Sequence, residues 1–254
     1  MFTRAIVRPP APNFREGLTS VDLGAPNYEL ALEQHEAYCA ALEHCGLTLT
    51  RLEPDPDYPD STFVEDTAVL TDRCGILARP GAPSRAGEVA KLRAVLADFY
   101  PSLLSIEAPA TLDGGDICDA GDHFFIGISE RTNEAGAQQL AERLRSFNYT
   151  SSFVDIRGVE GILHLKSGLA YLGDKRLAVI AELADRVRGY DLVSVNSDEE
   201  YAANCVRIND HVLVAEGYPI FAGALKELGY QTIALDMSEF QKMDGGLSCL
   251  SLRF

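Results

Sequence analysis

Short apolar runs alternate with tight polar turns along this chain, and the same order of elements recurs. Each unit has an apolar run, a turn rich in glycine, asparagine or aspartate, and a second apolar run, usually followed by an amphipathic stretch. Such turns are typical of β-hairpins, because these residues tolerate the backbone conformations that tight turns require. The pattern predicts four hairpins, with strands at 63–70 and 74–78, 115–118 and 124–127, 168–172 and 177–180, and 205–208 and 212–214.

Helices and further strands follow these hairpins. We expect helices over 84–99, from about 132 onward, and over 219–228, where Gly229 is well suited to end the helix. Further strands are expected near 105–106, 152–154, 192–195 and 232–235.

A fifth unit is divided between the two ends of the chain. Its last strand, 247–252, is expected to pair with the first strand, 4–7, and the helix 30–45 and strand 47–49 complete it. Units that cannot bury their apolar faces alone must pack against one another. The pattern therefore predicts an α/β fold, a five-bladed propeller of ββαβ modules with pseudo-fivefold symmetry around a central channel. An ordinary open α/β sheet is the alternative, since turn signals of this kind are common.

The composition of the chain limits which binding partners and which cellular compartment are expected. The chain has 254 residues, is 46% hydrophobic and has a formal net charge of −16. That charge argues against nucleic acid or an anionic membrane as a partner, and it is compatible with a cationic small molecule. No apolar run approaches the roughly 20 residues that span a bilayer, and no signal-peptide pattern opens the chain, so we expect a cytoplasmic protein. The six cysteines lack the paired spacing of a zinc site.

Three residues form a candidate catalytic set. Cys249 follows an Asp-Gly-Gly-Leu-Ser run near the C-terminus, His164 lies between two leucines, and Asp113 precedes two glycines. A thiolate is a strong nucleophile, a histidine can move protons near neutral pH, and an acid can orient the ring and stabilise its charged form. Taken singly, each has an ordinary interpretation as a buried thiol, a core histidine and a turn.

Acidic residues form a second group. Glu65 and Asp66 interrupt an otherwise apolar stretch, where burial without a cationic partner would be costly. Asp60 lies just before them, and Asp244 lies close to the candidate nucleophile. If the stretch faces a channel, Glu65 and Asp66 could bind a guanidinium through charge-assisted hydrogen bonds; otherwise they are a solvated strand end.

Two arginines form a third group. Arg85 and Arg131 both lie at expected helix starts, where the helix dipole normally favours anions. An arginine and a helix N-terminus together would suit a bound carboxylate. The alternative is that both are ordinary surface residues.

Taken together, these segments resemble dimethylarginine dimethylaminohydrolases, a family of the guanidine-modifying (pentein) superfamily. The resemblance extends from residue 17 to the C-terminus in the family's order. The segments that carry it are FVED (63–66), RPGAPSR (79–85), LDGGD (112–116), RTN (131–133), LHLKS (163–167), AANC (202–205) and DGGLSC (244–249). It implies a five-bladed α/β propeller, with residues 1–254 forming a single catalytic domain.

The resemblance also implies an activity and a role for each site residue. The reaction is hydrolysis of asymmetric Nω,Nω-dimethylarginine, and of Nω-monomethylarginine, to citrulline and the alkylamine, without a metal or organic cofactor. Cys249 would form a covalent thiouronium intermediate, His164 would protonate the leaving amine and then activate water, and Asp113 would orient His164. The implied substrate contacts are Glu65, Asp66 and Asp244 to the guanidinium, Arg85 and Arg131 to the α-carboxylate, and Asp60 with the backbone carbonyls of Leu18 and Met243 to the α-ammonium.

Two positions bear on the alternatives. Asp113 stands where some bacterial members of the family have glutamate, which shortens the reach to His164. Lys166 stands where the related arginine and agmatine deiminases have a second aspartate, which favours an N-methylated substrate. An arginine-deiminase-like or other guanidine hydrolase remains the first alternative. A non-catalytic propeller protein, such as a ribosome-associated anti-association factor, is disfavoured because such proteins lack the cysteine-histidine-acid set. A homodimer stays open, since oligomeric state varies in the family.

Overall fold

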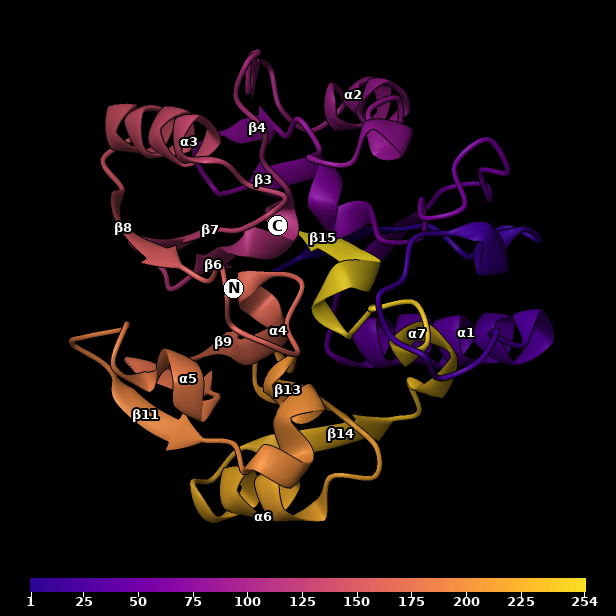
Figure 1. The fold of residues 1–254 in the computed structure, drawn as a ribbon, viewed down its shortest axis with the longest axis vertical. Coiled ribbons are helices and arrows are strands. Elements are labelled where there is room, and N and C mark those ends of the chain that lie inside the picture. The colour runs from indigo at the N-terminus through magenta and orange to yellow at the C-terminus, as the bar shows by residue number, and fades with distance from the viewer.

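The computed structural model describes residues 1–254 and contains five three-stranded sheets arranged around a common centre (Figure 1). In every sheet the first two strands in the module are antiparallel, and the third is parallel to the middle one. A helix connects the middle strand to the third in each module, as a parallel connection requires. The chain is therefore a five-bladed α/β propeller of ββαβ modules, and the open-sheet alternative is excluded.

The blades follow the chain, and the first module in sequence is completed by the last strand. Their elements are β3 (Ala68–Leu70), β4 (Gly75–Leu77), α2 (Glu88–Leu96) and β5 (Leu103–Ser105); β6 (Ile117–Asp119), β7 (His123–Ile128), α3 (Glu134–Ser146) and β8 (Thr150–Asp155); β9 (Leu169–Gly173), β10 (Arg176–Val179), α5 (Ala181–Ala184) and β11 (Asp191–Ser194); β12 (Val206–Ile208), β13 (His211–Ala215), α6 (Pro219–Glu227) and β14 (Gln231–Leu235); and β15 (Ser251–Arg253), β1 (Arg4–Val7), α1 (Tyr28–His44) and β2 (Thr48–Arg51).

The predicted pairing of the two chain ends is confirmed. β15 and β1 are antiparallel, with Ile6 opposite Leu252, and β2 runs parallel to β1. In Figure 1 both termini lie near the centre of the molecule, whereas α1, α2, α3 and α6 lie at the periphery. Closure by the last strand therefore brings the C-terminal residues to the centre of the propeller.

Three predicted strands begin too early in the sequence interpretation. Their first residues form short 3₁₀ helices instead: η2 (Val64–Thr67), η4 (Gly114–Asp116) and η6 (Ser248–Leu250). The other two blades have α4 (Leu165–Gly168) before β9 and η5 (Ser197–Ala203) before β12. Each first strand is thus preceded by a helical turn. A 3₁₀ turn of three or four residues is too short for the hydrophobic pattern to distinguish it from the start of the strand that follows.

The packing between blades is apolar. The largest cluster of buried apolar side chains contains 23 residues and joins the blades of β6, β9 and β12. A second cluster of 22 residues joins α1 to the β12 blade and to the turn that carries Cys249. Each blade packs against its neighbours through apolar side chains. The turns before the first strands are therefore held in fixed positions relative to one another.

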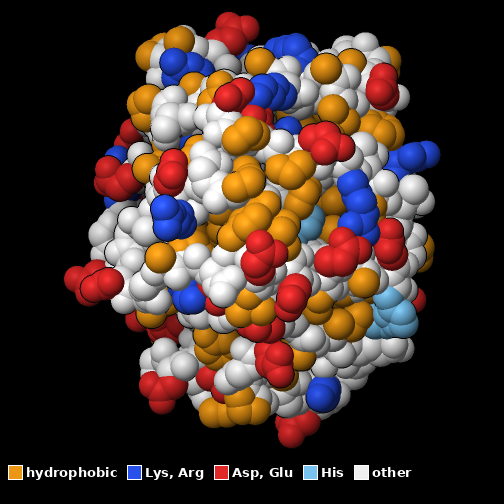
Figure 2. Space-filling view, turned by 90° about the vertical axis from the view of Figure 1, so that its right-hand side faces the viewer, with side chains coloured by type: hydrophobic (Ala, Val, Ile, Leu, Met, Phe, Trp, Pro, Cys, Tyr) orange, Lys and Arg blue, Asp and Glu red, His pale blue; other side chains and the backbone are white.

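Acidic residues outnumber basic ones in this chain, 38 to 22. Figure 2 shows acidic side chains across one face, together with a group of hydrophobic side chains near its middle. This distribution agrees with the net charge of −16. None of the helices has the length and apolar character that a membrane crossing would require.

Candidate active site

The candidate nucleophile, histidine and acid come from three blades. Cys249 lies on η6, His164 is the N-cap of α4, and Asp113 is the N-cap of η4. Cys249 and His164 line one cavity, together with Asp66 from η2. The helical turns before the first strands therefore bring together residues that are far apart in sequence.

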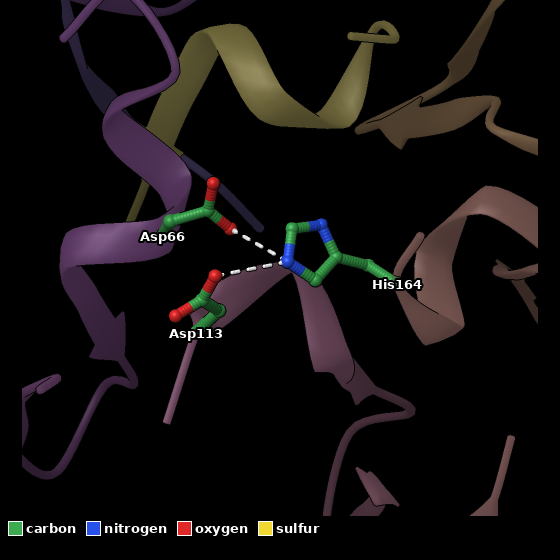
Figure 3. A group of neighbouring side chains, drawn as sticks. All are labelled: Asp66, Asp113 and His164. Atoms are coloured by element: carbon green, nitrogen blue, oxygen red, sulfur yellow. Dashed lines mark hydrogen bonds and ion pairs between the residues drawn. The ribbon is translucent and has the colours of Figure 1, made fainter. Parts of the chain in front are cut away.

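Two acids approach the same nitrogen of His164. Its Nε2 lies 3.0 Å from Asp113 Oδ2 and 4.0 Å from Asp66 Oδ1 (Figure 3). The backbone N–H of Leu165 donates to Asp116 Oδ1, which fixes the start of α4 against the neighbouring blade. Burial disfavours the imidazolium, but the charges of Asp66, Asp113 and Asp116 outweigh it and raise the pKa of His164 to about 9. The ring is therefore protonated at neutral pH and can act as a general acid.

The Cys249 thiol lies in an environment that keeps it protonated. The side chain is buried, and burial, with the nearby charges of Glu65 and Asp66, raises the pKa of the thiol to about 12. A cation placed beside the sulfur would reverse part of this effect, because it stabilises the thiolate. This environment thus suits a nucleophile that is activated when a cationic substrate binds.

Asp66 and Arg85 form a buried ion pair. Arg85 Nη1 donates to Asp66 Oδ2, and its Nε and Nη2 donate to Glu88 at 2.9 and 2.8 Å. The other oxygen of Asp66 accepts from the Gly115 N–H at 2.9 Å and faces His164. His164 and Arg85 together overcome the effect of burial and hold the pKa of Asp66 at about 2. Asp66 therefore stays charged and can hold a cation in the cavity.

The two predicted carboxylate-binding arginines differ in their surroundings. Both line the cavity, but Arg85 is buried and bound by Asp66 and Glu88, whereas the half-buried side chain of Arg131 has no hydrogen-bond or ion-pair partner. Arg131 lies just before a helix, as predicted, whereas Arg85 lies in a short 3₁₀ turn ahead of its helix. Arg85 ends the 3₁₀ turn η3 (Pro83–Arg85) ahead of α2, and Arg131 precedes Asn133, the N-cap of α3.

Glu65 is the site residue whose position differs most from the sequence interpretation. Its carboxylate does not line the cavity. It accepts from Ser248 Oγ at 2.8 Å and lies 2.5 Å from Lys166 Nζ and 3.1 Å from Arg253 Nη2. Because residues 64–67 turn as a 3₁₀ helix, the neighbouring side chains of Glu65 and Asp66 have different partners. The Glu65 carboxylate is thus bound by Ser248, Lys166 and Arg253, and its contact with a guanidinium stays a prediction.

A segment near residue 18 covers the cavity. The Leu18 N–H donates to Asp60 Oδ1 at 2.9 Å, and the Ser20 N–H donates to Asp244 Oδ2 at 2.6 Å. Leu18, Asp60 and Met243, the predicted contacts of the α-ammonium, all line the cavity, and so does Asp244, a predicted contact of the guanidinium. The cavity volume is only about 20 Å³, room for about one water molecule. The cavity must therefore widen before a compound the size of arginine can enter.

Asp66, Asp113 and His164 form a group that could offer ligands to a metal ion. Donor atoms of Asp66, Asp113 and His164 all lie within 4.8 Å of one another (Figure 3). Asp66 is already paired with Arg85, and the raised pKa of His164 keeps a proton on the ring that a metal would have to displace. The arrangement fits a protonated imidazole between carboxylates better than a resident metal ion.

Comparisons with known proteins place this site in a family. No protein-family model matches the chain. The N(G),N(G)-dimethylarginine dimethylaminohydrolase of Pseudomonas aeruginosa is 44% identical over 257 residues, which span 100% of both proteins. The chain belongs to the dimethylarginine dimethylaminohydrolase family. The resemblance inferred from the sequence motifs is therefore confirmed.

Solved structures of dimethylarginine dimethylaminohydrolases superpose closely on this one. A cysteine-to-serine mutant of the Pseudomonas aeruginosa protein, complexed with citrulline, gives a TM-score of 0.97 at 44% identity and covers 100% of both chains. A histidine-to-glycine variant, as an adduct with S-methyl-L-thiocitrulline, gives a TM-score of 0.96 at 44% identity, again over 100% of both chains. The family binds small arginine-derived molecules on this fold.

Several residues of the site escaped the sequence interpretation. Glu88 is the second acid of the Arg85 ion pair, Asp116 holds the His164 turn, and Arg253 pairs with Glu65. Glu88 has a local signal, since it lies three residues after Arg85 in a helical segment. Asp116 is the second acid of the Leu-Asp-Gly-Gly-Asp motif. Arg253 has no such signal, because Glu65 is distant in sequence.

Proposed function

We propose that the protein hydrolyses asymmetric Nω,Nω-dimethylarginine, and Nω-monomethylarginine, to citrulline and dimethylamine or methylamine. The observation that carries this proposal is the shared cavity of Cys249, His164 and the charged Asp66, with Asp113 bonded to the histidine. Membership of the family supports the same reaction. The reaction needs only groups of this chain, the substrate and a water molecule.

The substrate is held at both ends. We assign the guanidinium to Asp66 and Asp244, the α-carboxylate to Arg131 with Arg85 behind it, and the α-ammonium to Asp60. The backbone carbonyls of Leu18 and Met243 complete the last contact. Charge-assisted hydrogen bonds at both ends aim the guanidinium carbon at the sulfur. Glu65, which is paired with Lys166 and Arg253, stays a predicted third contact of the guanidinium.

The reaction then proceeds in two halves. The bound cation lowers the pKa of Cys249, the thiol proton leaves to solvent, and the thiolate forms a bond to the guanidinium carbon. His164 donates its proton to the alkylamine as the C–N bond breaks, which leaves a thiouronium on the cysteine. The neutral imidazole next takes a proton from water, the hydroxide adds to the same carbon, and the C–S bond breaks. The hydroxyl proton passes to the departing sulfur, so that citrulline and the Cys249 thiol are released, and the histidine is again protonated.

Parallel assays test this assignment. Purified protein is incubated with dimethylarginine, monomethylarginine, arginine and agmatine, and the ureido product is measured. We expect the two methylated substrates to be turned over fastest and a Cys249→Ser variant to bind dimethylarginine without turnover. Faster turnover of free arginine would instead support the arginine-deiminase-like alternative. Undiminished activity of the serine variant would remove Cys249 from the mechanism.

The domain organisation, cellular compartment and partners of the protein are also proposals. We propose that residues 1–254 act as a single catalytic domain, because the reacting groups come from different blades. Six free cysteines support a reducing compartment, and we place the protein in the cytoplasm. Nucleic acid and membranes are not expected partners at this net charge. A homodimer stays a prediction that light scattering of the purified protein tests.

A further inference from the structure

Glu65 is the centre of a buried charge cluster behind the active site. Its side chain is 4% exposed and has two cationic partners, Lys166 Nζ at 2.5 Å and Arg253 Nη2 at 3.1 Å. Ser248 Oγ donates to its second oxygen at 2.8 Å. Breaking one partner of a buried pair leaves a charge without compensation, so each member depends on the others.

Arg253 holds the turn that carries the nucleophile. Its Nη1 donates to the backbone oxygens of Ser248 and Ser251 at 3.1 and 3.0 Å and to Ser251 Oγ at 2.8 Å. The fully buried Tyr38 of α1 bonds to the same Ser251 hydroxyl at 2.6 Å. The residues on both sides of Cys249 are therefore bound by one guanidinium, whose planar fork fixes them in a single geometry.

Lys166 extends the same cluster to the histidine. It belongs to α4, and His164 is the N-cap of that helix. Glu65 thus contacts the turn of the nucleophile through Ser248 and Arg253 and the turn of the histidine through Lys166.

The cluster also separates two cavities. Lys166, Ser248 and Arg253 line a cavity of about 740 Å³, whereas His164 and Cys249 line the small catalytic cavity. Each turn therefore presents its reacting residue to one side and its member of the cluster to the other. None of the four cluster residues lines the catalytic cavity.

We propose that the Glu65–Lys166–Arg253 cluster, with Ser248, is a positioning device that fixes the placement of Cys249 relative to His164. This inference rests on the proposed function, because it assigns positioning residues to the same reaction. A displacement of about 1 Å in such a site costs on the order of 100-fold in rate. Arg253 and Glu65 are the members that carry most of the contacts.

Arg253→Met tests the proposal. The methionine keeps the apolar length of the side chain but removes the fork that binds Ser248, Ser251 and Glu65. We expect kcat for dimethylarginine to fall by about 10- to 100-fold while KM changes by less than about threefold, because Arg253 does not contact substrate. Arg253→Lys restores the charge without the fork and should recover part of the lost kcat.

Labelling of Cys249 with a haloacetamide at different pH values separates positioning from simple stability. Glu65→Gln removes a charge that raises the pKa of the thiol, so its labelling profile should move to lower pH. Arg253→Met leaves Glu65 with one cation fewer, so its profile should move to higher pH. Both variants should nevertheless lose kcat, and the double variant should lose less than the product of the two single losses. A merely structural role would lower Tm without these opposite shifts.

Arg207→Met is the matched control. Arg207 lines the same large cavity and donates to the backbone oxygens of Leu172 and Asn209, but it has no contact with the Cys249 turn. Its kcat and labelling profile should match the parent protein. Where Arg253→Met fails to fold, Ser248→Ala removes only the hydroxyl bridge to Glu65 and should still lower kcat.

Two results would overturn the proposal. One is an Arg253→Met or Ser248→Ala protein with parental kcat and labelling profile. The other is independent, multiplicative losses in the Glu65 and Arg253 variants. A parent protein that does not hydrolyse dimethylarginine would contradict the proposed function instead, and the labelling profiles would still test the placement of Cys249.

Discussion

At the scale of single residues, the two carboxylates beside His164 differ in their other hydrogen-bond partners. Asp66 and Asp113 both face His164, but Asp66 is also held by Arg85, whereas Asp113 Oδ1 accepts from the Gly81 N–H. Against the effect of burial, these two acids and Asp116 raise the pKa of His164 to about 9. A proton on this ring at neutral pH is what the departing amine needs.

Replacing Asp113 with asparagine tests this relation. Asp113→Asn keeps the shape of the side chain but removes the charge that stabilises the imidazolium, so the pKa of His164 should fall below about 9. His164 then loses its proton at a lower pH than in the parent protein. The basic limb of the kcat–pH profile should therefore move to lower pH. We expect kcat to fall by about 100-fold or more. A basic limb that stays in place would contradict the role of Asp113.

At the scale of elements, the helical turns before the first strands decide where the chemistry lies. Each turn ends at a strand that is fixed by its blade, so the side chain on the turn has little freedom. Gly115 on η4 illustrates how closely these turns approach one another. A Cβ at this position would lie 2.7 Å from His164 Nδ1 and 2.8 Å from Asp66 Oδ1.

Gly115→Ala should therefore disable the site. The added methyl group displaces His164 or Asp66, and we expect kcat/KM to fall by at least about 100-fold, as measured with dimethylarginine. Gly223→Ala in α6 is the control, because a Cβ there meets no atom within 4 Å. Alanine at this helical position should leave activity unchanged and raise stability by about 0.5–1 kcal/mol. Parental activity in Gly115→Ala would show that the turns can move apart.

At the scale of the whole molecule, the terminal strands close the propeller. Ile6 lies fully buried on β1, between β15 and β2, and packs in an apolar cluster with Leu252. The cysteine on η6 is placed by the same closure, since β15 follows its turn directly. The stability of this seam and the position of the nucleophile are therefore linked.

Ile6→Ala tests the seam. Loss of the buried side chain should reduce the free energy of unfolding by about 2–5 kcal/mol, measured by denaturant titration. Leu192→Ala, on β11, is the comparison, because Leu192 is 38% exposed and should cost less than about 1 kcal/mol. Equal losses in the two variants would mean that closure by the terminal strands contributes nothing special to stability.

The sequence alone determined the recurring module, the closure of the propeller by the terminal strands, and the cysteine, histidine and acid of the site. These features have local signals, because hairpin turns, helix ends and short motifs depend on residues close together in the chain. Tertiary structure decided the partners of the charged groups. Arg85 is bound to Asp66 and Glu88, and Glu65 meets Arg253 rather than the cavity, because turns from different blades converge at the centre. The direction of a side chain on a one-turn helix depends on those distant neighbours, and no local pattern in the sequence encodes it.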